Sequence, residues 1–115
     1  KADQLFHETI AESSNNAALV HTVVTLWRMR EEIPEVKKTY NAVCVHDAQT
    51  RYEEHKAIFD ALKAHDPAGA RNAMREHFQR LLEAMLEATE RLAMEAVQQQ
   101  ASESRQRFLA SAKIG

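Results

Sequence analysis

An aspartate followed by a proline, Asp66-Pro67, constrains the fold of this chain more than any other feature. Aspartate is a favoured N-cap and proline a favoured first helical residue, so a new helix is predicted to begin there. His55 and His77 each stand eleven residues from Asp66, which is about three helical turns. If the flanking segments fold back on each other, the two imidazoles lie at the same height on facing surfaces.

The composition favours helices along the whole chain. Its 115 residues include only two glycines and two prolines, and no segment shows the alternating apolar pattern of a strand. The length fits one domain with a real core. The formal net charge of -2, with both signs interspersed, gives no surface for a nucleic-acid backbone. The predicted fold class is therefore all-α, in a chain that does not itself bind DNA.

Several classes of protein are excluded by what the sequence lacks. No apolar stretch approaches a membrane span and no signal-peptide pattern is present, so a cytoplasmic location without membrane contact is expected. The single cysteine, Cys44, excludes an internal disulfide and is interpreted as a small buried thiol rather than a ligand or nucleophile. Because the chain starts at Lys1 and enters a helical pattern directly, it is expected to be an N-terminally truncated fragment.

The predicted helices share one-sided apolar faces and cover residues 2–12, 17–30, 67–97 and a segment that begins at residue 47 or 48 and ends at residue 64. Residues 35–45 are predicted to form a short helix and a connection, and Pro34 marks the end or a kink of the helix before it. Beyond residue 97 the composition becomes polar. Residues 98–115 are expected to be a polar tail, or a terminal helix that docks through Phe108, Leu109 and Ile114.

Asp3 and His7 add a carboxylate and a third imidazole to the histidine pair. They stand at i and i+4, on one face of the first predicted helix. Three imidazoles and one carboxylate suit a divalent transition metal, with Zn²⁺ as the leading candidate and Ni²⁺, Mn²⁺, Fe²⁺ or Co²⁺ as alternatives. Four protein ligands would close a tetrahedral site, whereas a five- or six-coordinate ion would keep positions for water or a carboxylate ligand, and such an open site could act as a sensor.

The alternative for each of these residues, taken singly, is an ordinary surface histidine or a helix-start aspartate. His21, His46 and His65 provide an internal comparison, because none has both a carboxylate at i-4 and a mirror-related partner across a turn. The candidate set is therefore limited to one aspartate and three histidines.

Two other function classes remain open. A di-iron enzyme is disfavoured because Glu-x-x-His is absent from the sequence. A mononuclear metalloenzyme could use Glu54 or Glu76 as a base. Adjacent helical residues point about 100° apart, so neither glutamate readily shares the inward direction of its neighbouring histidine. The second of these classes is a helical interaction module without metal. The prediction is that the chain is not an enzyme.

Several segments resemble the FCD domain, the C-terminal ligand-binding domain of FadR-subfamily, GntR-type bacterial transcription regulators. Residues 3–7 resemble its Asp-x-x-Phe-His motif. Residues 10–19 resemble its Ile-Ala-x-x-Ser-Gly-Asn-x-x-Leu segment, with Asn15 at the usual glycine. The later matching residues are Glu54, His55, Ile58, Ala61, Asp66, Ala70, Met74 and His77. His65 stands where glycine is common.

The resemblance covers roughly residues 2–90 and implies an antiparallel helical bundle with a metal ion and a small organic acid in its interior. The implied metal ligands are Asp3, His7, His55 and His77. Asn16 matches a position that can face the effector, and its alternative role is to cap the second helix. Residues 1–97 then make up most of the metal- and effector-binding bundle, and residues 98–115 follow it.

The resemblance also implies a regulatory role. Such regulators bind operator DNA as homodimers through an N-terminal winged helix-turn-helix domain, which is expected to lie outside this chain. Leu26-Trp27-x-x-Arg30, followed by Pro34, resembles the branch that responds to hexuronates and related sugar acids. The alternative for Trp27 is a core position. The predicted function is an effector-sensing domain that modulates DNA binding by its parent protein.

Overall fold

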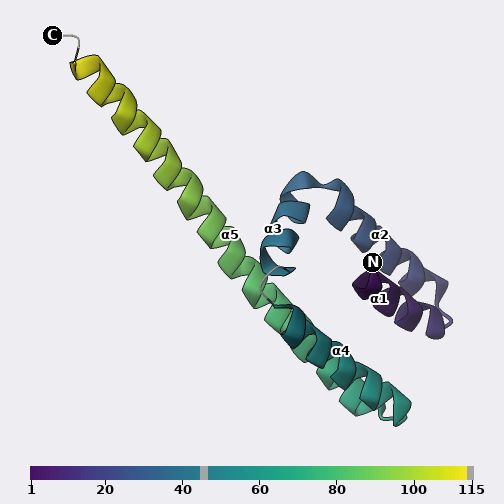
Figure 1. The fold of residues 1–115 in the computed structure, drawn as a ribbon. Helices are drawn as coiled ribbons and strands as arrows, with labels where there is room; N and C mark the ends of the chain where they lie inside the picture. The colour runs from purple at the N-terminus through teal and green to yellow at the C-terminus, as the bar shows by residue number, and fades with distance from the viewer. Residues whose placement is uncertain (45–46, 114–115) are drawn as a thin grey trace. The chain divides into compact units, whose positions relative to one another are not determined.

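The computed structural model describes residues 1–44 and 47–113, and within these ranges all regular structure is helical (Figure 1). The helices are α1 (Ala2–Ser13), α2 (Ala17–Glu32), α3 (Pro34–Cys44), α4 (Ala48–Lys63) and α5 (Pro67–Ala112). They form two compact units, Lys1–Ala42 and Val43–Gly115. The all-α prediction is confirmed. In the described part of the chain, no helix carries an apolar stretch long enough to cross a lipid bilayer.

His46 and Ile114 lie outside the described residues, and so does Val45 at the end of the predicted 35–45 segment. The side chain of Cys44 is also outside what the structure describes.

In the first unit, α1 packs against α2 across the connection formed by residues 14–16. Asn16 begins α2 because its Oδ1 accepts hydrogen bonds from the backbone N–H groups of Ala18 and Leu19, at 3.1 and 3.2 Å. Ile33 is extended and ends α2, and Pro34 is the first residue of α3. The predicted break at Pro34 and the predicted short helix after it are both confirmed.

The second unit is built on a hairpin in which α4 packs against α5. Asp66 caps α5, because its Oδ1 accepts a 2.9 Å hydrogen bond from the N–H of Gly69, and Pro67 is the first helical residue. Ile58 is 1% exposed and is the one large apolar side chain in the described residues that is fully buried. The predicted helix start at Asp66-Pro67 is confirmed.

Two connections require left-handed backbone. Among the described residues, Asn15 and His65 are the non-glycine residues with positive φ, and φ is 55° at both. They follow the last turns of α1 and α4. This conformation costs most side chains about 1–2 kcal/mol, and asparagine tolerates it better than most. In the family pattern that the chain resembles, glycine is usual at both of these positions. The left-handed backbone conformation explains that preference.

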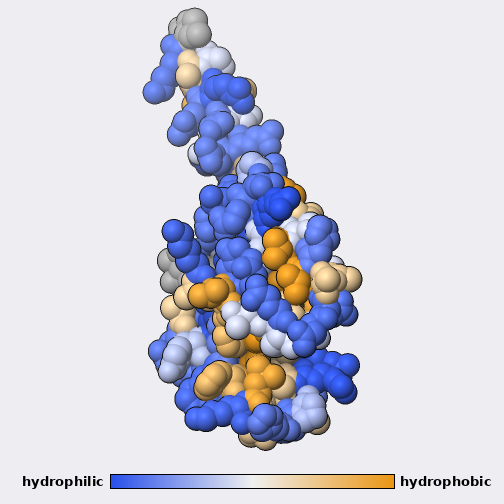
Figure 2. Space-filling model, turned by 90° about the vertical axis from the view of Figure 1, so that its right-hand side faces the viewer, coloured by the Kyte–Doolittle hydropathy of each residue, from blue (hydrophilic) through white to orange (hydrophobic). Residues whose placement is uncertain are grey.

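The helix α5 is longer than predicted. It continues past residue 97 to Ala112, so the polar segment is helical rather than a separate tail. Polar side chains do not end a helix when they are good helix formers, and Gln99 donates a 3.1 Å hydrogen bond to Glu103 one turn later. The face of this distal segment seen at the top of Figure 2 is mostly hydrophilic. Phe108 and Leu109 are 71% and 49% exposed, so the expected docking of a terminal helix is wrong for these two residues.

Candidate metal centre

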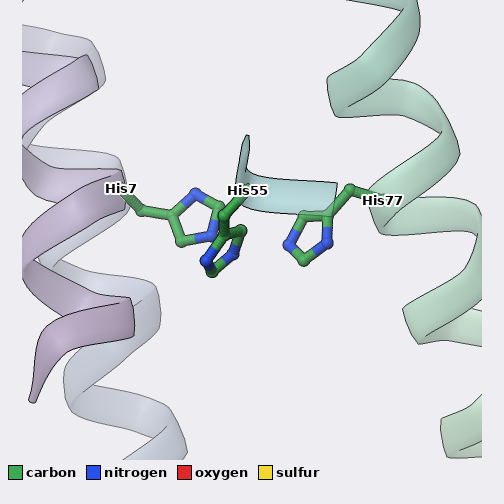
Figure 3. A group of neighbouring side chains, drawn as sticks. All are labelled: His7, His55 and His77. Atoms are coloured by element: carbon green, nitrogen blue, oxygen red, sulfur yellow. The ribbon is translucent and has the colours of Figure 1, made fainter. Parts of the chain in front are cut away.

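His55 and His77 face each other across the α4–α5 hairpin. Their ring centroids are 4.8 Å apart, and Figure 3 shows the His77 side chain reaching from α5 toward His55 on α4. His77 is buried, with 3% of its surface exposed, and His55 is half-buried. The equal spacing of the two histidines from Asp66 produces this arrangement, because about three helical turns separate each histidine from the turn. The predicted meeting of these imidazoles is confirmed, and their use as metal ligands stays a prediction.

The carboxylate of Glu54 contacts His77, the buried histidine of this pair. Glu54 Oε2 lies 2.7 Å from His77 Nδ1, and the Glu54 side chain is 17% exposed. The expectation that Glu54 would point away from the inward direction of His55 is therefore wrong. The buried face of a packed helix is more than 100° wide, so two adjacent residues can both face the partner helix.

Arg80, on α5, forms hydrogen bonds with two acidic residues of the other helix, Glu54 on α4 and Asp47 immediately before it. Its Nε donates to Glu54 Oε1, its Nη2 donates to Glu54 Oε2 at 2.9 Å, and its Nη1 donates to Asp47 Oδ2. Burial alone would raise the pKa of the Glu54 carboxyl, but hydrogen bonds from Arg80 and His77 outweigh it and hold the pKa below its usual range. Glu54 therefore stays a carboxylate that only accepts hydrogen bonds.

Sequence reasoning missed the role of Arg80. The available signal was its position three residues after His77, which places both side chains on one face of α5. Nothing in the spacing indicated that Glu54 and Asp47, on the other helix, would lie within reach.

The first unit holds the second predicted pair. Asp3 Oδ1 lies 3.5 Å from His7 Nε2, one turn along α1, and both side chains are largely buried. The prediction that Asp3 and His7 share one helical face is confirmed. Each of the two predicted ligand pairs therefore lies within a single unit of the chain.

The Arg30 guanidinium contacts the other carboxylate oxygen of Asp3. Its Nη1 is 3.3 Å from Asp3 Oδ2, and its guanidinium lies 4.4 Å from the ring centroid of Trp27 and 4.3 Å from that of Tyr40. The His7 and Trp27 rings are 6.1 Å apart. Trp27 is half-buried, which is common for a tryptophan in a core. The Arg30 guanidinium lies over its ring in a cation–π contact.

The remaining candidates differ from these two pairs. His21 lies on an exposed part of α2, and His65 is exposed in the turn after α4. Asn16 uses its Oδ1 to cap α2, which is the alternative role weighed for it. Its contact with an effector stays a prediction.

Comparisons with known proteins place the chain in a family. The family model of the FCD domain matches residues 1–80. Proteins described as the Exu regulon transcriptional regulator, from Escherichia coli (strain K12), Escherichia coli O157:H7 and Shigella flexneri, are each 30% identical to the chain over 77 residues. The match covers 67% of this chain and 30% of each relative, so the chain corresponds to less than a third of their length. No solved structure matches the chain.

Proposed function

Because this chain belongs to the FCD domain family, we propose that it is the effector-sensing domain of a bacterial GntR-type transcription regulator of the FadR subfamily. The family match and the regulators among its relatives support a regulatory, effector-binding role. Operator DNA would be bound by the rest of the parent protein, acting as a homodimer in the cytoplasm. The chain would contribute the sensor and not an enzymatic activity.

The proposed sensor holds one divalent metal ion. Its ligands would be Asp3, His7, His55 and His77. The observation that carries this proposal is the His55–His77 pair, whose rings the fold places 4.8 Å apart. Because each unit already brings two donors together, little side-chain freedom is left to lose when an ion binds. Three imidazole nitrogens and one carboxylate oxygen suit Zn²⁺ first, and also Ni²⁺, Mn²⁺, Fe²⁺ or Co²⁺.

The proposed effector is a small organic acid, of the sugar-acid class. Its carboxylate would bind the ion, and the sugar ring would lie near the aromatic and charged groups beside Asp3. The half-buried Trp27 and the Arg30 guanidinium support a polar, ring-shaped ligand. Asn16 lies at the opposite end of α2 from Arg30, so it would contact a part of the effector away from Asp3. It would do so through its amide nitrogen, because its Oδ1 already accepts two backbone hydrogen bonds.

Signalling would follow from a change in helix packing. An acid that binds the ion more tightly in one packing of the helices shifts the chain toward that packing, by as much as its affinities for the two packings differ. In a dimeric parent protein the shift would change the spacing of the attached DNA-binding domains. Effector binding would in this way control operator binding.

Calorimetric titration of the zinc-loaded chain with galacturonate tests this function. We expect binding to the zinc-loaded chain, and binding weakened by roughly tenfold or more after the metal is removed with a chelator, since the carboxylate then loses its metal partner. Galactose, which lacks the carboxylate, is the matched control and should not bind. Equal binding of the acid with and without metal would contradict the proposal. Chemical conversion of the acid during the titration would favour the metalloenzyme, and a chain that binds neither metal nor acid would favour the interaction module.

A further inference from the structure

We propose that Glu54 and Arg80 are positioning residues that fix the ring tautomer of His77 and so direct its Nε2 atom to the metal. The proposal rests on the metal site proposed above. It is carried by a continuous chain of hydrogen bonds inside the second unit, from Asp47 through Arg80 and Glu54 to His77.

Glu54 determines which ring nitrogen of His77 carries the proton. A neutral histidine carries one ring proton, and either nitrogen can hold it. Glu54 Oε2 is 2.7 Å from His77 Nδ1, and a carboxylate can only accept a hydrogen bond. Nδ1 therefore carries the proton and donates it to Glu54. Nε2 is left with the lone pair that a metal ligand needs.

Hydrogen bonds from Arg80 fix the position of Glu54. Both of its oxygens accept hydrogen bonds from Arg80, and this two-point contact fixes the plane of the carboxylate as well as its position. Arg80 is held in turn by Asp47 at the start of α4. The His77 ring, 3% exposed, is thus anchored on its Nδ1 side by groups from both helices of the hairpin. Such supporting partners typically change metal affinity by about 10- to 100-fold.

A purely structural role is the competing explanation, because the same contacts also join α4 to α5. The two roles differ in what they predict for the imidazole. A structural ion pair between Arg80 and Glu54 would hold the helices together whichever nitrogen of His77 carried the proton. A positioning role requires one tautomer, and requires that tautomer to depend on Glu54.

The test combines a spectrum of the metal-free chain with a zinc affinity. Two-bond ¹H–¹⁵N correlation spectra of the full chain should show His77 protonated at Nδ1, and Glu54→Gln should lose this preference because its amide can either donate or accept. In competition with a chromophoric chelator, Glu54→Gln should bind zinc about 10- to 100-fold more weakly. Arg80→Lys, which keeps the charge but loses the two-point contact, should show a smaller loss.

Glu53→Gln is the matched control, because Glu53 is exposed and its carboxylate contacts Gln49 on the same helix. It should change neither the tautomer nor the affinity. Protonation of the wild-type His77 at Nε2 would overturn the inference, even if Glu54→Gln fails to fold. A folded Glu54→Gln variant that keeps both the His77 tautomer and the zinc affinity of the wild type would also overturn the inference. A wild-type chain that shows the Nδ1 tautomer but binds no zinc would contradict the proposed metal site and leave the control of the tautomer by Glu54 standing.

Discussion

Replacement of His55 or His77 by alanine should remove nearly all of the divalent metal that the wild-type chain retains after dialysis. Each substitution deletes one of the four proposed ligands, and the deleted imidazole comes from a pair that the hairpin holds in place. The loss should exceed that of Glu54→Gln, because a ligand contributes more to affinity than the group that orients it. Elemental analysis of the dialysed proteins measures the effect directly.

His21→Ala is the matched control for these variants. His21 is an exposed histidine on α2, and its removal leaves both ligand pairs intact. It should retain metal like the wild type. Equal metal contents in the His21, His55 and His77 variants would contradict the assignment of the ligands. Circular dichroism of each variant should show unchanged helix content, so that a loss of metal is not a loss of fold.

Ile58→Ala should destabilise the α4–α5 hairpin by about 2–4 kcal/mol, the range expected when a buried isoleucine is cut back to alanine. Ile58 is 1% exposed, and the other buried apolar residues in the described part of the chain are the small Ala11 and Ala88. Because Ile58 stands three residues after His55, the same change should also weaken metal binding.

Urea unfolding followed by circular dichroism measures this loss. Phe59→Ala is the matched control, because Phe59 is the next residue on α4 and is 53% exposed. Phe59→Ala should lower the free energy of unfolding by under about 1 kcal/mol, since a half-exposed side chain loses less contact area on truncation. An equal cost for the two substitutions would mean that Phe59, and not Ile58 alone, packs in the interior of the hairpin.

The hairpin was predictable because its signals are local. Asp66 and Pro67 determine where α5 begins, and helical geometry then determines which residues of α4 and α5 lie opposite each other. The same holds for Asp3 and His7, since two residues at i and i+4 meet on any helix. These features require no knowledge of how distant side chains pack.

The features that were missed depend on packing between helices. Arg30 reaches Asp3 across 27 positions of sequence, and Arg80 reaches Glu54 across 26. Each contact requires a particular rotamer and a particular separation of two helices, which apolar spacing does not determine. The length of α5 differs from the prediction for another reason. The polar composition of residues 98–115 predicts a tail or a separate terminal helix, although the glutamine, glutamate and arginine residues of this segment are good helix formers and continue α5.

Zinc K-edge X-ray absorption on the zinc-loaded chain tests the central claim most directly, because it reports the atoms bound to the ion. We predict about three imidazole ligands at about 2.0–2.1 Å, completed by oxygen. In the His77→Ala variant, any zinc that remains should show one imidazole fewer. A coordination shell made of oxygen alone, or one containing the sulfur of Cys44, would contradict the account.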